Sequence, residues 1–171
     1  MSFGYDRLKQ TGDMGARKKT NNQWFETQDS IGYWEDFYRP KVIWIELADK
    51  GRFAVDTIDN YLTLNGSFIM TGENLEYISA VLNNPVTSWH FNTFCISSGV
   101  GTNQWRELYV KELYIPQVNP EIITEVEQNV KRLHESKRNN IHSSTDDNII
   151  NHLIYNIIEL SQDEIDFIES R

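Results

Sequence analysis

The feature that most constrains this fold is a change in hydrophobic periodicity along the chain. Residues 42–47 (VIWIEL) and 52–57 (RFAVDT) are rich in β-branched residues or alternate apolar with polar positions, as strands do. Residues 61–70 (YLTLNGSFIM) place Asn65-Gly66 between two alternating runs. This dipeptide predicts a β-hairpin because both residues accept positive φ. The first half of the chain is therefore predicted to contain a small sheet.

Later segments repeat apolar residues every three to four positions, which is the helical period. The segment 71–84 (TGENLEYISAVLNN) is predicted to form a helix with Thr71 as its cap. Asn119-Pro120 is a good helix start, and the stretches after it carry the apolar stripes of two helices. Ser161 and Glu164 have the spacing of a capping box.

Two segments are harder to assign. Residues 85–98 fit either a helix or a strand, and residues 108–116 (LYVKELYIP) are predicted to be a strand that ends at Pro116. The chain as a whole predicts a mixed α+β (α/β) fold, with a small mixed or antiparallel sheet, packed helices and a C-terminal helical tail.

Three regions are expected. Residues 1–23 are polar and lack apolar periodicity, which predicts a loosely ordered lead-in. This opening suggests a chain cut from a longer protein, although a natural flexible terminus has the same pattern. Residues 24–118 are expected to form the mixed core, and residues 119–171 a helical segment.

Composition narrows the class of protein. No run approaches the roughly 18 apolar residues of a membrane helix. The N-terminus lacks the apolar region and cleavage site of a secretory signal. The single cysteine, Cys95, cannot form an internal disulfide, which fits a reducing compartment. We therefore expect a cytoplasmic protein without a membrane partner.

Charge is distributed unevenly. The formal net charge of -9 argues against a polyanionic partner. However, the chain up to Lys19 carries five basic and two acidic residues. From Glu121 onward it carries eleven acidic and five basic residues. Such asymmetry can leave one basic face on an acidic protein. A solvated mixture of charges without an electrostatic purpose is the alternative.

Common cofactor sites are missing from the sequence. It has no G-x-x-x-x-G-K-[ST] phosphate loop, and the glycines at 99 and 101 do not open a helix as a dinucleotide loop requires. The four histidines are far apart, and one cysteine cannot anchor a thiolate metal site. We therefore expect no cofactor and no metal in this chain.

Catalytic groups are also poorly placed. Cys95 lies in an aromatic run, where a buried thiol is the usual finding. A nuclease centre could combine Asp36, Glu46 and Lys50, or Asp56 and Asp59. The spacing of Glu46 and Lys50 does not put an acid and a lysine on one strand face, as a two-residue spacing would. By itself the chain is not expected to be an enzyme.

Four segments, in order, resemble a known family. They are residues 24–44 (WFETQDSIGYWEDFYRPKVIW), 68–85 (FIMTGENLEYISAVLNNP), 105–116 (WRELYVKELYIP) and 153–169 (LIYNIIELSQDEIDFIE). Together they resemble the TaqI-like C-terminal specificity domain of adenine-specific DNA methyltransferases and of fused type II restriction-modification enzymes used in bacterial defence. The resemblance covers roughly residues 24–171. Asn84 and Val42 stand where the family often has serine and isoleucine.

The resemblance implies a target recognition domain that reads a short sequence in double-stranded DNA. In that family a separate N-terminal catalytic domain binds S-adenosylmethionine and methylates adenine at N6. Its [ND]-P-P-[YFW] motif is missing here, since Asn84-Pro85-Val86 lacks the second proline and the ring. S-adenosylmethionine is thus expected to bind in the parent enzyme, and residues 1–23 are expected to link its catalytic domain to this chain.

Residues 24–47, a segment rich in aromatic rings, then have two expected roles. Trp34, Phe37 and Trp44 are predicted to lie in the core, because rings bury a large area. Arg39 and Lys41 flank Pro40, which would hold both cations near one surface, where we expect them to contact DNA phosphates.

Base contacts are expected from polar loops with glycines that permit close approach. Arginine suits guanine, whereas asparagine and glutamine suit adenine. The loop of residues 97–106 supplies Ser97, Ser98, Thr102, Asn103, Gln104 and Arg106, and the hairpin tip supplies Asn65. The basic run Arg17, Lys18 and Lys19 would follow the DNA backbone or simply link domains.

Two other functions stay open. A divergent metal-dependent nuclease would use Asp36 or Glu46. A protein-interaction module would bind a partner through its aromatic surface, and the acidic charge balance favours this reading.

Overall fold

The computed structural model describes residues 9–23, 25–26, 29, 32–97, 99, 101–141 and 144–170. The chain forms two compact units, Met1–Glu35 and Asp36–Arg171. The first unit thus extends beyond the predicted lead-in. The helices after residue 119 belong to the same compact unit as the sheet.

Turns organise the described part of the first unit. The N–H of Gly12 donates to the carbonyl of Arg17 (2.9 Å), and the N–H of Arg17 donates to the carbonyl of Lys9 (3.1 Å). The buried amide of Gln10 donates to the carbonyls of Gln23 and Glu26, at 3.1 and 3.0 Å. These bonds give the segment local order that its polar composition did not predict.

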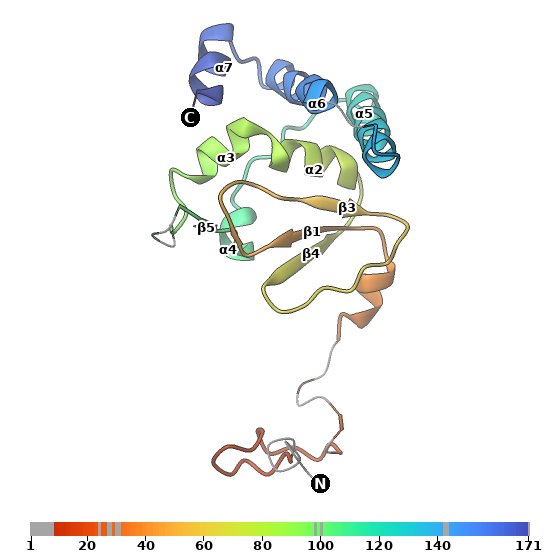
Figure 1. The fold of residues 1–171 in the computed structure, drawn as a ribbon, viewed down its shortest axis with the longest axis vertical. Coiled ribbons are helices and arrows are strands. Elements are labelled where there is room, and N and C mark those ends of the chain that lie inside the picture. The colour runs from red at the N-terminus through yellow and green to blue at the C-terminus, as the bar shows by residue number, and fades with distance from the viewer. Residues whose placement is uncertain are drawn as a thin grey trace. The chain divides into compact units, whose positions relative to one another are not determined.

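The second unit contains two small antiparallel sheets (Figure 1). The larger has the order β3-β1-β4, with strands β1 (Lys41–Ile45), β3 (Ala54–Asp56) and β4 (Ser67–Thr71). The smaller pairs β2 (Leu47–Ala48) with β5 (Asn103–Gln104). A 3₁₀ helix, η1 (Trp34–Tyr38), precedes β1.

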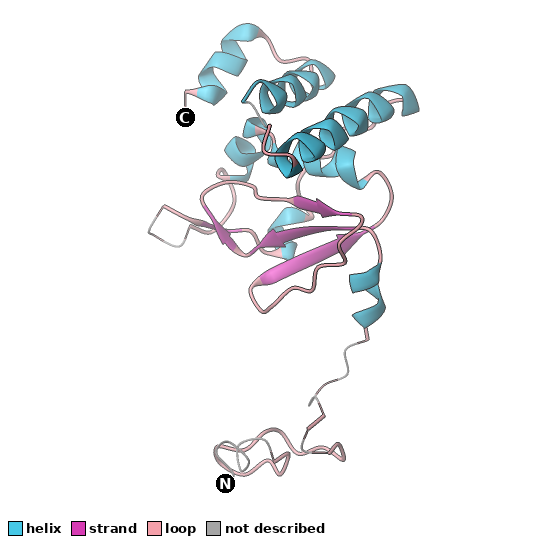
Figure 2. Ribbon diagram, turned by 45° about the vertical axis from the view of Figure 1, so that its right-hand side comes forward, coloured by secondary structure: helices cyan, strands magenta, loops and turns pink. Residues whose placement is uncertain are grey.

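The helices of this unit are α2 (Leu75–Asn83), α3 (Pro85–Phe91), α4 (Glu107–Val110), α5 (Pro120–Arg138), α6 (Ser144–Ile157) and α7 (Gln162–Glu169). All except α4 cover the larger sheet in two layers (Figures 1 and 2). Helix α2 packs on β1 and β3, while α5 and α6 pack on α2, and α7 packs on α3. The predicted mixed α+β fold with a small antiparallel sheet and packed helices is confirmed.

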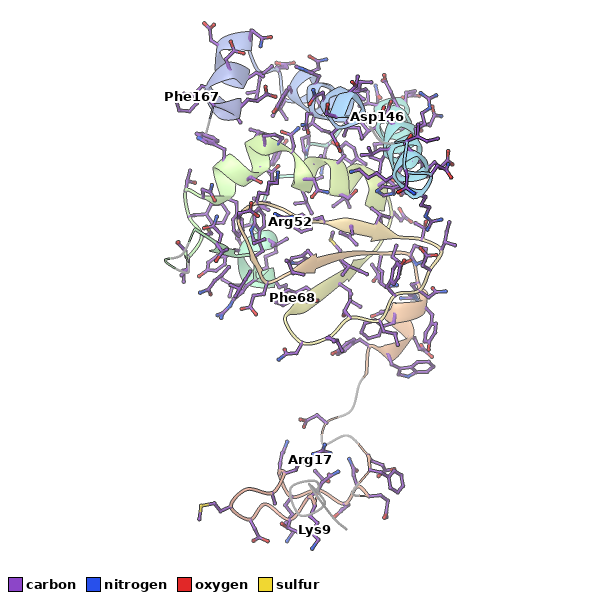
Figure 3. All side chains as sticks on the ribbon, viewed as in Figure 1. Lys9, Arg17, Arg52, Phe68, Asp146 and Phe167 are labelled. Carbon is purple, nitrogen blue, oxygen red and sulfur yellow. The ribbon has the colours of Figure 1, made fainter. Side chains whose placement is uncertain are left out.

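The core follows the period of each element. Val42 and Trp44 point to the same face of β1 and are buried, and the ring of Trp44 stacks on Phe68 of β4, which Figure 3 labels, with centroids 5.3 Å apart. Val126 and Val130 on α5 are buried in a second cluster with residues of α2 and α6. The apolar stripe predicted after Asn119-Pro120 is therefore the packing face of α5.

The predicted hairpin over residues 61–70 is wrong, although its turn exists. Gly66 has φ +88°, and the N–H of Ser67 donates to the carbonyl of Leu64 (3.2 Å). Strands β3 and β4 are both antiparallel to β1, so they run parallel to each other. The chain must therefore return along the sheet between them, and residues 57–66 form that connection instead of a strand (Figure 1).

Two other local predictions are wrong. Residues 107–110 form α4 and not a strand, because Val110 and Leu113 both face the core. Residues three apart share a face in a helical turn but not in a strand. The predicted cap Thr71 ends β4; α2 begins after Asn74, which has a left-handed φ of 53°.

The aromatic segment is less buried than predicted. Trp44 is 5% exposed, as expected, and Phe37 is half-buried. Trp34 is 55% exposed, so its assignment to the core is wrong. Helix η1 buries none of its residues.

Candidate nucleic-acid interface

The predicted contact residues fall in three separate places. Arg17, Lys18 and Lys19 belong to the first unit, where Figure 3 labels Arg17. There Arg17 donates to the carbonyl of Glu26 (3.3 Å), and Lys18 lies 3.2 Å from the carboxylate of Asp29. Lys18 and Lys19 are exposed. Their predicted contact with the DNA backbone stays a prediction.

Lys41 lies at the start of β1 and is completely buried, so its predicted position at the surface is wrong. Its Nζ donates to Asp56 Oδ2 (2.6 Å) and to the carbonyl of Phe37 (2.8 Å). Lys41 and Asp56 are direct partners in the register of β1 and β3, and the bond to Phe37 ties η1 to this end of the strand pair. The ammonium group is therefore used inside the fold and cannot reach a phosphate.

Asp56 is the acceptor that organises this end of the sheet. Its carboxylate also accepts the N–H groups of Asp59 (3.0 Å), Asn60 (3.1 Å) and Tyr61 (2.7 Å). Burial by itself raises the pKa of Asp56, but the hydrogen bonds from Lys41 and Tyr61 outweigh it and hold the pKa below its usual range. Asp56 is thus ionised and fixes the start of the connection to β4.

Arg39 is the cation that stays accessible near this end. Its side chain is 67% exposed, and its Nη1 lies 3.1 Å from the carboxylate of Asp36, three residues earlier. An exposed pair of this kind contributes little to stability, about 0–1 kcal/mol. Arg39 can therefore exchange Asp36 for a phosphate.

The other end of β1 brings the predicted base-reading segments together. The N–H of Glu46 donates to the carbonyl of Gly66 (2.8 Å), and the carbonyl of Glu46 accepts the N–H of Trp105 (2.6 Å). The tip at Asn65 and the end of the loop at Arg106 thus lie on either side of one residue. Two segments distant in the sequence converge at the junction of β1 and β2.

Trp105 anchors the end of the loop. It is 1% exposed and stacks on Phe91 with ring centroids 3.7 Å apart and an interplanar angle of 3°. Its Nε1 donates to the carbonyl of Ala48 (3.3 Å), and its own carbonyl accepts Nε1 of Trp44 (2.8 Å). The residues next to Trp105 are therefore presented from a rigid base.

The loop itself is partly organised by β5. Gln104 pairs with Leu47, and Asn103 pairs with Ala48, while a bridge joins Asn103 to Ser97. The side-chain amide of Asn103 donates to that of Asn92. Thr102, Asn103 and Gln104 are half-buried and Ser97 is exposed, whereas Ser98 lies outside the described residues.

Glu46 forms an ion pair that the sequence did not predict. Its Oε1 accepts Nε of Arg106 at 2.7 Å, with side chains 30% and 49% exposed. Asn65 is exposed as well. The sequence suggests for Glu46 only a role as a nuclease ligand, because no local pattern links it to Trp105 and Arg106, which are distant in the sequence.

A groove of about 490 Å³ lies between the connection after β3 and the last turns of α5. The lysines and the arginine that line this groove already form ion pairs: Lys131 with Glu76 (3.6 Å), Lys137 with Asp147 (3.2 Å) and Arg138 with Asp59 (2.6 Å). Burial and the nearby Lys137 lower the pKa of His134 below its ordinary value, which keeps the ring neutral at pH 7. The groove is therefore a poor site for an anion.

The residues proposed for a nuclease are occupied by other partners. Asp36, Glu46 and Asp59 pair with arginines, and Asp56 holds Lys41. Within the described ranges, no three His, Cys, Asp or Glu side chains lie together as metal ligands would. Burial raises the pKa of the Cys95 thiol, which makes it a weak nucleophile at neutral pH.

Across the part of the chain that the structure describes, no helix combines the length and the apolar character needed to cross a bilayer. No protein-family model matches the chain, and no curated protein matches it.

Proposed function

We propose that this chain recognises a short sequence in double-stranded DNA, as the target recognition part of an N6-adenine DNA methyltransferase or a fused restriction-modification enzyme. The observation that carries the proposal is the convergence at Glu46. The tip with Asn65 and the loop ending at Arg106 are both predicted to contact bases, and Gly66 and Trp105 in these two segments hydrogen-bond to Glu46. Direct readout needs such a cluster of donors and acceptors on one rigid surface.

Each group at this surface has a chemical role. Asn65, Asn103 and Gln104 suit adenine, and Arg106 suits guanine. Leu47 and Leu64, which are 54% and 86% exposed, place apolar surface beside them, where a thymine methyl group would be accepted. The set can therefore distinguish bases and not only attract phosphate.

Arg39 is proposed to contact phosphate at a distance from the base readers. Strand β1 has five residues, so at about 3.3 Å per residue its ends are about 13 Å apart. This length corresponds to about four base steps of about 3.4 Å along one DNA strand. Arg39 would then bind the backbone beside the sequence that the other end reads.

The acidic balance fits a recognition part that works with a second domain. With a net charge of -9, affinity would depend on a few well-placed contacts and on the catalytic domain of the parent protein. S-adenosylmethionine would bind to that catalytic domain. Adenine methylation would take place there, while this chain selects the site.

The test is fluorescence anisotropy of the purified chain with a pool of random-core duplexes, titrated with salt, followed by sequencing of the bound fraction. We expect enrichment of a short motif. The logarithm of affinity should fall with the logarithm of salt concentration, with a slope of about -0.9 per phosphate contact. The absence of both would contradict the proposal.

A protein-interaction module is the second candidate. The connection between β3 and β4 exposes Ile58, Tyr61, Leu62 and Leu64, each at least 60%. Exposed apolar residues of this density are typical of protein-binding surfaces. This function predicts binding to a partner protein that changes little with salt and no affinity for DNA in the same assay.

A further inference from the structure

We propose that Glu46 is a specificity-determining positioning residue, which holds Arg106 for contact with a base and away from phosphate. This inference rests on the proposed DNA recognition and adds a role for the acidic residue at the same surface. It starts from the 2.7 Å contact between Glu46 Oε1 and Arg106 Nε.

The backbones of both residues are fixed. Glu46 is hydrogen-bonded to Gly66 on one side and to Trp105 on the other. Arg106 directly follows the buried Trp105 and is the N-cap of α4. Only the two side chains are thus free to move, and the carboxylate of Glu46 limits the directions in which Arg106 can extend.

The hydrogen bond to Nε leaves the two terminal nitrogens of the Arg106 guanidinium available. In the described parts of the chain, Nη1 and Nη2 of Arg106 have no hydrogen-bond or ion-pair partner. Arginine reads guanine through two N–H groups that donate to O6 and N7. With Nε on Glu46, the two terminal nitrogens of this half-exposed side chain remain available as such a pair of donors.

The charge of Glu46 also discriminates between partners. A carboxylate 2.7 Å from the guanidinium repels a phosphate that approaches the same group. A base edge carries no net charge and is tolerated. Glu46 thereby reduces affinity for DNA of any sequence and increases the preference for the correct base, which is how a repulsive element produces specificity.

The test compares selections from one random-core duplex pool by the full chain and three variants. Glu46→Gln keeps the shape but removes the charge. Glu107→Gln is the matched control, because this exposed neighbour of Arg106 also loses one charge but forms no ion pair with described residues. Arg106→Lys keeps the cation but loses the planar pair of donors.

We expect both glutamine variants to bind the pool a few-fold more tightly than the wild type, because each removes one negative charge. In Glu46→Gln the preference for guanine at one position of the motif should fall about tenfold, and Arg106→Lys should lose preference at the same position. In Glu107→Gln the motif should be unchanged.

A wild-type motif that is retained in full by Glu46→Gln would overturn this inference and leave the proposed function intact. Equal loss of preference in both glutamine variants would also overturn it, since it would show an effect of charge alone. A wild-type chain that neither binds nor enriches a motif would instead refute DNA recognition, and the inference with it.

Discussion

The two ends of β1 each hold a cation against a carboxylate, at almost the same distance and in opposite surroundings. Lys41 and Asp56 are 2.6 Å apart, with side chains 0% and 3% exposed. Arg106 and Glu46 are 2.7 Å apart, with side chains 49% and 30% exposed. The two ion pairs therefore have nearly the same length but differ in burial.

Burial decides what each pair can do. Removing one partner of a buried pair leaves an uncompensated charge, so Lys41 and Asp56 are bound to each other and to the fold. An exposed pair is nearly neutral in stability, and the donors of its cation that the carboxylate does not use remain available to another partner. The Lys41 end therefore stabilises the sheet, while the Glu46 end is available for recognition.

The largest expected difference is in stability. Lys41→Met should lower the free energy of unfolding by about 3–5 kcal/mol, because it leaves Asp56 buried without its cation. Arg106→Met should change it by less than about 1 kcal/mol, as for other exposed pairs. Urea denaturation followed by tryptophan fluorescence measures both. Equal losses in the two variants would remove the distinction between the ends.

The second-largest expected difference between the two ends of β1 is in how stability depends on acidic pH. The depressed pKa of Asp56 contributes stability that is fully present above its unfolded pKa, about 3.9, and is lost as pH falls through the lower folded value. Asp56→Asn cannot make this contribution. The difference in stability between wild type and Asp56→Asn should therefore shrink below about pH 4, as measured by urea denaturation at several pH values.

Glu46→Gln serves as the control for the acid experiment. It also removes one carboxylate, but from an exposed pair. We expect its stability to follow that of the wild type closely over the same pH range, including below about pH 4. A stability gap in Glu46→Gln as large and as pH-dependent as that in Asp56→Asn would contradict the comparison.

The smallest expected effect concerns Arg39. Arg39→Ala removes an exposed side chain that pairs only with its neighbour Asp36 among the described residues, so stability should change little. If Arg39 contacts one phosphate, the salt slope of DNA binding should become shallower by about 0.9, with the base motif unchanged. Anisotropy across salt measures the slope. A changed motif would show that Arg39 reads bases.

Local patterns predicted the parts of the fold that local physics determines. The start of α5 at Asn119-Pro120 is confirmed, since the side chain of Asn119 accepts the N–H of Ile122 (3.0 Å). The capping box of α7 is confirmed as well, because the carboxylate of Glu164 accepts the N–H of Ser161 (2.8 Å). In both cases all partners are within three residues of one another.

Contacts between residues distant in the sequence explain the predictions that were wrong. Lys41 looked exposed because it follows Arg39 and Pro40, but its neighbour across the sheet, Asp56, determines its burial. The predicted hairpin over residues 61–70 is wrong because the order β3-β1-β4 requires the chain to return along the sheet. Glu46 was missed as a recognition residue because Gly66 and Trp105 meet it only after folding.

The central claim is that Asn65 and the loop ending at Arg106 form one DNA-binding surface at Glu46. The most direct test is a ¹⁵N NMR titration of the full chain with the duplex that it enriches. We predict that the amide signals of Asn65, Gly66 and residues 102–106 shift together, at one shared dissociation constant, while those of α7 stay in place. Shifts confined to α5, α6 and α7, or to only one of the two segments, would contradict the account.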